Sequence, residues 1–153
     1  MIEGLIGTAR RLASSGATGK PRQSDLRRSI STAYYALFHA FAKDGADLYV
    51  GASTSRPTAA WTQAYRGLDH GFARNACLKV VEPGFPAPLV SCAATFVWLQ
   101  GERHTADYDP VARFTRGQAV LIVAEAEQAI RDLRGAGRAD RRAFAVQIRM
   151  KPR

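Results

Sequence analysis

The chain has 153 residues, close to the length of one domain. Hydrophobic residues make up 46% of the sequence, enough for a packed core, which excludes a disordered chain. The 22 Lys and Arg residues outnumber the 13 Asp and Glu residues, giving a formal net charge of +9. The two cysteines exclude a disulfide scaffold, and the longest apolar run, residues 119–124, is too short to span a membrane. We therefore expect a basic, cytoplasmic, single-domain protein.

The N-terminal segment predicts an amphipathic helix, because apolar residues recur at helical spacing from Ile2 to Leu12. Its Arg and Ser residues also give it a loose likeness to an organellar transit peptide, although Glu3 interrupts that pattern. We interpret the segment as the first helix of the fold.

A second helix is predicted from about Asp25 to about Lys43, where apolar residues recur at steps of three and four. Ser24 is of the type that caps helix N-termini, and Asp25 favours the first turn. Gly45 and Gly51 weaken the helical pattern beyond that end.

A third apolar stripe at helical spacing follows the loop at residues 53–58. It consists of Trp61, Ala64, Tyr65, Leu68, Phe72 and Ala76. The connection 82–88 holds three prolines, and a fourth helix after it ends at Asp109-Pro110. The inward positions of this fourth helix are Leu89, Ala93, Phe96 and Val97.

A fifth helix opens with Thr115 and Gln118 at the spacing of a capping box and is stopped by Gly135 and Gly137. Its predicted apolar stripe is Leu121, Ile122, Ala126, Ala129, Ile130 and Leu133. Residues 146–150 are the one weak strand candidate. The fold class predicted from these elements is all-α, an antiparallel four- to five-helix up-and-down bundle over residues 1–135.

Residues 136–153 are expected to form a basic C-terminal arm, since residues 138–153 hold six basic residues and one acidic residue. Such an arm neutralises nucleic-acid phosphates or is a solvated tail. The sequence shows no HExxH, cysteine cluster, phosphate-binding glycine loop or GxSxG motif. We therefore expect no metal and no cofactor.

Polar residues gather at two places in the predicted helices. Arg66 and His70 are four residues apart and share one face of the third helix, where they form a cationic strip for phosphate or an ordinary exposed face. In the second cluster Arg103 is four residues from Asp107, and His104 is four residues from Tyr108.

The second cluster has two interpretations. An exposed cluster gives only local helix support, worth a few tenths of a kcal/mol per pair. A cluster that faces a groove can orient a phosphate through Arg103 and carry a proton on His104. The second helix adds a mixed polar face, on which His39 is interpreted as a buried, satisfied histidine. That face consists of Arg28, Ser31, Tyr35 and His39.

Two segments resemble the signatures of one family. Residues 27–40 (RRSISTAYYALFHA) resemble the second-helix signature of bacterial HEPN-domain proteins. Residues 103–110 (RHTADYDP) resemble the second hallmark of that family, near the end of the helix after the long loop. The order and spacing of the predicted helices agree, so the resemblance covers nearly all of residues 1–135. It implies a four- or five-helix bundle that commonly dimerises.

Many members of that family are metal-independent ribonucleases that act as toxins, paired with a nucleotidyltransferase-like antitoxin or lodged in phage-defence systems. Others are proposed to bind RNA or nucleotides without cutting. The cutting members carry an Arg, a polar neighbour and a His a few residues further on. Arg103 and His104 match the first two, but Tyr108 stands at the third position, and a phenol is a poor base at neutral pH.

The resemblance therefore implies a prokaryotic, homodimeric protein that binds RNA or a nucleotide with a degenerate ribonuclease motif. Arg103 would hold a phosphate, Asp107 would fix Arg103, and Tyr108 would stack or donate a hydrogen bond. Arg66 and His70 would be second contributors to this binding site.

Two alternatives stay open. The first is an active metal-independent ribonuclease in which Arg103, His104 and Tyr108 are the catalytic group and His104 is the acid or base. The second is a non-catalytic helical protein-interaction module, in which the polar turn only closes the bundle.

Overall fold

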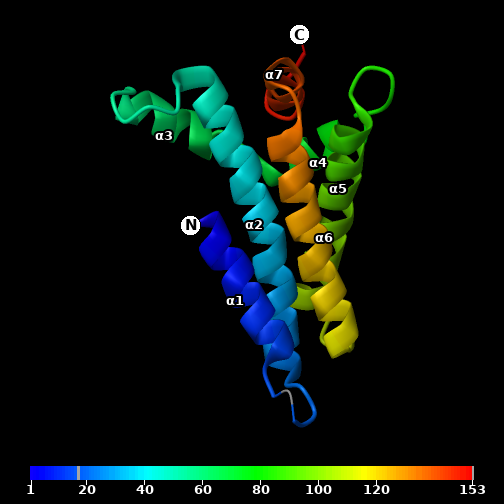
Figure 1. Cartoon of the computed structure of the whole chain (residues 1–153). Helices are drawn as coiled ribbons and strands as arrows, with labels where there is room; N and C mark the ends of the chain where they lie inside the picture. The colour runs from blue at the N-terminus through cyan, green and yellow to red at the C-terminus, as the bar shows by residue number, and fades with distance from the viewer. Residues whose placement is uncertain (17, 153) are drawn as a thin grey trace.

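The computed structural model describes residues 1–16 and 18–152. All regular secondary structure in these ranges is helical, and the long helices form an up-and-down antiparallel bundle (Figure 1). Its four helices are α1 (Ile2–Ser14), α2 (Gln23–Val50), α5 (Ala87–Tyr108) and α6 (Arg116–Gly135). The predicted all-α bundle is confirmed. No helix of the described residues is long and apolar enough to cross a bilayer.

Helix α2 lies at the centre of the molecule. It packs against α1, α5 and α6, and its C-terminal half also contacts α3 (Thr58–Arg66) and α7 (Arg138–Gln147). Every apolar position that the spacing predicts for this helix is buried, namely Leu26, Ile30, Ala33, Tyr34, Leu37, Phe38 and Phe41. Tyr34 and Leu37 have no exposed surface. Burial of one such side chain stabilises the fold by roughly 1.5–3 kcal/mol.

The predicted boundaries of α2 are wrong at both ends. The helix starts at Gln23 with Arg22, and not Ser24, as its N-cap residue. It continues through Gly45 to Val50 and ends at Gly51, whose φ of +118° suits glycine.

Gly45 has a packing role inside α2. The guanidinium of Arg149 lies where a Cβ at position 45 would stand. Its Nη2 donates to the carbonyl oxygens of Phe41 at 2.8 Å and Ala42 at 3.0 Å. The missing side chain therefore makes room for an arginine from the C-terminal segment, a role that local helix propensity does not reveal.

The single third helix predicted from the apolar stripe is two helices in the structure. Helix α3 ends at Arg66, and α4 (His70–Cys77) begins after Asp69. The Asp69 carboxylate accepts a hydrogen bond from the backbone N–H of Phe72 at 2.7 Å, which caps α4. Leu68 lies buried in the connection, so the stripe continues although the helix does not.

Helix α6 begins with the predicted capping box between Thr115 and Gln118, which is confirmed. One member of its predicted stripe is wrong: Leu121 is 55% exposed, and Val123 is buried on the core side. The helical period explains both observations. Successive residues are about 100° apart around the helix, so Val123 lies about 200° from Leu121 and faces the core when Leu121 faces solvent.

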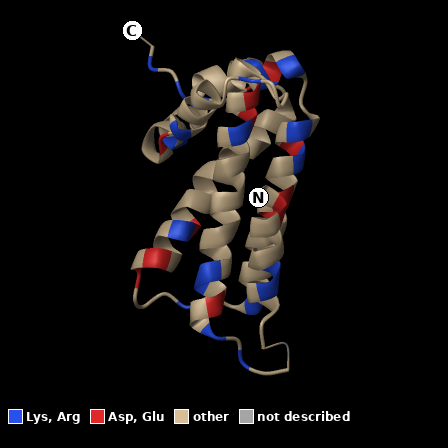
Figure 2. Cartoon of the chain, turned by 90° about the vertical axis from the view of Figure 1, so that its left-hand side faces the viewer, with Lys and Arg blue, Asp and Glu red and all other residues tan. Residues whose placement is uncertain are grey.

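The weak strand candidate at residues 146–150 does not form a strand, because α7 runs through Gln147. Phe144 is buried and packs edge-on against Phe41, with ring centroids 5.1 Å apart. Arg141 pairs with the buried carboxylate of Asp44. The basic C-terminal segment is therefore anchored to α2 by apolar and charged contacts. Across the whole molecule, acidic residues lie among the Lys and Arg residues (Figure 2).

Candidate functional site

Arg103 lies near the C-terminal end of α5 and points toward α2. Its Nε is 2.8 Å from an Asp107 carboxylate oxygen, and its Nη2 donates to the Tyr35 hydroxyl at 3.0 Å. Ser31 donates to the same Asp107 carboxylate at 3.3 Å. The Arg103–Asp107 pair expected from the sequence thus forms, and α2 holds both of its members.

Three tyrosine rings surround the Arg103 guanidinium. Its central carbon is 5.9 Å from the ring centre of Tyr34, 5.5 Å from that of Tyr35 and 5.6 Å from that of Tyr108. A cation within about 6 Å of an aromatic face is attracted to it. Since the side chain keeps 21% of its surface exposed, Arg103 is oriented by the protein but still reaches solvent.

A hollow of about 460 Å³ lies beside this arginine, between α4 and α5. Its lining consists of Arg74, Gln100, Gly101, Arg103, His104 and Thr105. Among the residues that the structure describes, the hollow is lined by two guanidiniums and one imidazole and by no carboxylate. Positive charge in a concave site attracts anions, and guanidinium groups form paired hydrogen bonds with phosphate.

His104 and Tyr108 lie on the solvent side of the site. His104 is exposed and lines the hollow, whereas Tyr108 is 63% exposed and lies next to it. Their ring centres are 5.0 Å apart. Both rings are therefore available to a planar group of a ligand whose charged part occupies the hollow.

The expected pairing of Arg66 and His70 on one helix face is wrong, because the break between α3 and α4 separates them. Arg66 is exposed at the end of α3. His70 turns inward, where its Nδ1 is 2.6 Å from the Tyr34 hydroxyl and its ring stacks on Phe38 at 3.8 Å. Arg74, one turn along α4 from His70, is the residue of this segment that reaches the hollow.

The surroundings of His70 lower the pKa of its imidazole. Burial lowers its pKa below the ordinary value of 6.5, and the nearby charge of Arg103 acts in the same direction. His39 behaves similarly: burial lowers its pKa, and its Nδ1 is 2.6 Å from the Tyr65 hydroxyl. This contact agrees with the interpretation of His39 as a satisfied histidine, but the side chain is half-buried and not buried as expected.

Two residues that position the candidate site are not identified by the local sequence pattern. The sequence pattern puts Tyr35 on a polar face of α2, but only the packing of α5 shows that it holds Arg103. Arg27 donates to the carbonyl oxygens of Ala106 at 2.8 Å and Ala112 at 2.5 Å. It therefore caps the end of α5 and fixes the turn that carries the site, a role set by helix order and not by local pattern.

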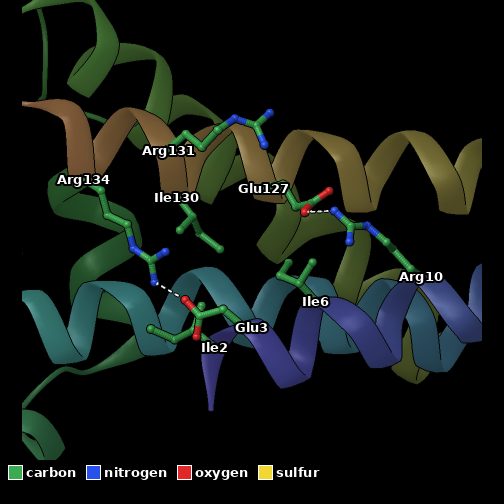
Figure 3. A pocket seen from close by; sticks show the side chains of 8 residues that line it. All are labelled: Ile2, Glu3, Ile6, Arg10, Glu127, Ile130, Arg131 and Arg134. Carbon is green, nitrogen blue, oxygen red and sulfur yellow. Dashed lines mark hydrogen bonds and ion pairs between the residues drawn. The ribbon is translucent and has the colours of Figure 1, made fainter.

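A second concavity lies between α1 and α6, and its volume is about 190 Å³. Its floor is formed by Ile2, Ile6 and Ile130. Ion pairs join Arg10 to Glu127 and Arg134 to Glu3 across it (Figure 3). Because the carboxylates of Glu3 and Glu127 line this groove, it suits an anion less well than the hollow beside Arg103, whose lining has no carboxylate among the described residues.

Comparison of the chain with protein-family models, with curated proteins and with solved structures finds no match.

Proposed function

We propose that this protein binds RNA or a nucleotide by holding a phosphate group in the hollow between Arg74 and Arg103. The observation that carries the proposal is the lining of that hollow, which contains two guanidiniums and no carboxylate among the described residues. Asp107 and Tyr35 orient Arg103, so little side-chain freedom is lost when a phosphate binds. The exposed rings of His104 and Tyr108 offer a face to the base.

The biological setting is also part of the proposal. The protein is a HEPN-like member of a prokaryotic toxin–antitoxin or phage-defence system, acts as a homodimer, and pairs with a nucleotidyltransferase-like antitoxin. Support comes from the resemblance of residues 27–40 and 103–110 to the two family signatures. Tyr108 at the third motif position favours binding over cutting, since it replaces the usual histidine.

The binding proposal is tested with a fluorescein-labelled RNA dodecamer, whose anisotropy is measured over a series of salt concentrations. Arg74→Ala is expected to weaken binding about tenfold. The slope of log affinity against log salt concentration should become shallower by about one, which corresponds to the loss of one phosphate contact. The matched control is Arg11→Ala, which removes the same charge from an exposed position on α1. Equal losses in the two variants would show a general charge effect and contradict the proposal.

A ribonuclease activity is the second candidate, because His104 and Arg103 line the same hollow. A proton carrier beside a phosphate-holding arginine is what RNA cleavage without a metal requires. Incubation of the protein with structured RNA in the presence of a chelator tests this candidate. Cleavage that His104→Ala abolishes supports it, and intact RNA at high protein concentration with retained binding rejects it.

The remaining alternative is a protein-interaction module whose polar turn only closes the bundle. In that case Arg103→Ala lowers the melting temperature, and the wild-type protein does not bind the RNA dodecamer at low salt. That result rejects the RNA-binding proposal.

A further inference from the structure

A chain of partly exposed rings crosses three helices and ends at the hollow. We name it the ring track; its members are Trp61, Tyr65, His39, Tyr35, Tyr108 and His104. Tyr108 and His104 are exposed, and the other four rings are half-buried. The ring track thus extends the candidate site along α2 to α3.

The outer half of the ring track runs from α3 onto α2. Trp61 stacks on Tyr65 with ring centres 5.1 Å apart, and Tyr65 stacks on His39 at 5.9 Å. The guanidinium of Arg56 lies 4.3 Å from the Trp61 ring centre. Tyr35 follows, with its ring centre 6.3 Å from that of His39.

The inner half of the ring track passes through Arg103. The Tyr35 hydroxyl accepts a hydrogen bond from Arg103, which lies over Tyr35 and Tyr108. Tyr108 then contacts His104 at the rim of the hollow. Neighbouring groups along the ring track are 5.0–6.3 Å apart, measured between ring centres or from a ring centre to the central carbon of Arg103. The path from α3 to the hollow therefore has no break.

The outer rings are fixed in position although they are not part of the core. The Trp61 Nε1–H donates to an Asp47 carboxylate oxygen at 2.8 Å, and the Tyr65 hydroxyl contacts His39. Helix α3 has no buried residue, and Figure 1 shows it projecting away from the bundle. These rings are therefore pre-positioned on a helix that contributes little to hydrophobic stability.

We propose that the ring track is the path of a single-stranded RNA, whose bases stack on its rings while one phosphate occupies the hollow. This inference rests on the proposed function and names its ligand class. Aromatic rings interleaved with arginines bind single strands irrespective of sequence, because every base has a face that stacks. Arg56 covers Trp61 in the free protein, so a base that stacks there displaces the guanidinium toward the neighbouring phosphate. The net charge of +9 favours RNA over a protein partner.

Tryptophan fluorescence tests the proposal directly, because the chain has only two tryptophans. Trp98→Phe leaves Trp61 as the sole reporter. A single-stranded oligouridylate dodecamer is expected to quench this fluorescence, whereas uridine 5′-monophosphate, which only fills the hollow, leaves it unchanged. A duplex RNA of the same length is expected to bind less tightly, because its bases are already stacked.

Affinity measurements on variants complete the test. Trp61→Ala is expected to weaken oligouridylate binding about tenfold, while Trp61→Phe restores most of the affinity because it keeps a ring. Trp98→Ala, which removes an exposed tryptophan outside the ring track, is expected to have no effect. Circular dichroism of each variant checks that the helices remain folded.

The outcomes separate the two proposals. Wild-type affinity in both Trp61→Ala and Trp98→Ala, with binding still weakened in Arg74→Ala, overturns the ring track and leaves the hollow intact. Unchanged Trp61 fluorescence at saturating oligouridylate also overturns the ring track. No binding of any RNA by the wild-type protein rejects the proposed function, and the ring track with it.

Discussion

Arg103 on α5 donates a hydrogen bond to the hydroxyl of Tyr35 on α2 at 3.0 Å. The two residues are far apart in the sequence, and the packing of α2 against α5 brings them together. The contact fixes the direction of the arginine at the edge of the hollow. It links the central helix of the fold to the phosphate-binding group that we propose.

Tyr35→Phe is expected to weaken RNA binding about fivefold, because Arg103 loses one of the groups that orient it. The ring and its cation–π contact remain, so the free energy of unfolding changes by only about 1 kcal/mol. Anisotropy and thermal denaturation measure the two effects. Tyr49→Phe makes the same change elsewhere on α2 and should leave RNA affinity unaltered; an equal loss in both variants would rule out the specific role of Tyr35.

Gly101→Phe is expected to block the hollow without removing any charge. Gly101 lines the hollow, and a Cβ built on it has no neighbour within 4 Å. Replacing a glycine inside a helix generally favours the helix, so the melting temperature should not fall. RNA affinity should drop about tenfold or more, as measured by anisotropy.

The control for this steric block is Gly4→Phe, since a Cβ at Gly4 on α1 also meets open space. Unchanged RNA affinity in Gly101→Phe would show that the ligand does not enter the hollow.

Gly45→Ala is expected to destabilise the fold by about 1–3 kcal/mol, because the new methyl group takes the place of the Arg149 guanidinium. Arg149 would leave the carbonyl oxygens of α2, and the C-terminal segment would lose one anchor. Denaturant unfolding measures the change. Gly4→Ala, which meets no atom, is expected to stabilise slightly, and a similar gain in Gly45→Ala would contradict the packing role.

Stability is expected to fall as the pH decreases from about 7 to about 5.5. Burial lowers the pKa of both His70 and His39, and Arg103 acts on His70 in the same direction while Asp69 opposes it. Below about pH 6.5 the unfolded imidazoles therefore take up protons more readily than the folded ones, whose pKa is lower. Thermal denaturation of the double variant His39→Gln/His70→Gln should show a smaller loss of stability over this pH range. A loss as large as that of the wild type would show that other titratable groups cause it.

The helical bundle was predictable because apolar residues mark one face of each long helix at a period of 3.6 residues. The same pattern missed the break between α3 and α4, since Leu68 stays buried in the connection and keeps the stripe continuous. It also missed α7, in which four of the ten residues are charged, although Phe144 is buried. Helix boundaries depend on caps and on tertiary contacts that the period does not record.

Some contacts of the candidate site could be predicted from residue spacing within one helix, whereas others depend on how the helices pack. Arg103 and Asp107 form their pair within one helix turn, as their spacing predicts. Tyr35 contacts Arg103 from α2, and Arg74 lines the same hollow from α4, so their roles depend on how α2, α4 and α5 pack. The predicted Arg66–His70 pair failed for the same reason, because it assumed one continuous helix.

The most direct measurement of the central claim is a titration of the isotope-labelled protein with uridine 5′-monophosphate, followed by nuclear magnetic resonance. We predict that the backbone amides of Arg74, Gly101 and Thr105 shift together and saturate, while those of Ile6 and Ile130 in the α1–α6 groove do not move. Shifts confined to the α1–α6 groove, or no shifts at saturating nucleotide, would contradict a phosphate site beside Arg103.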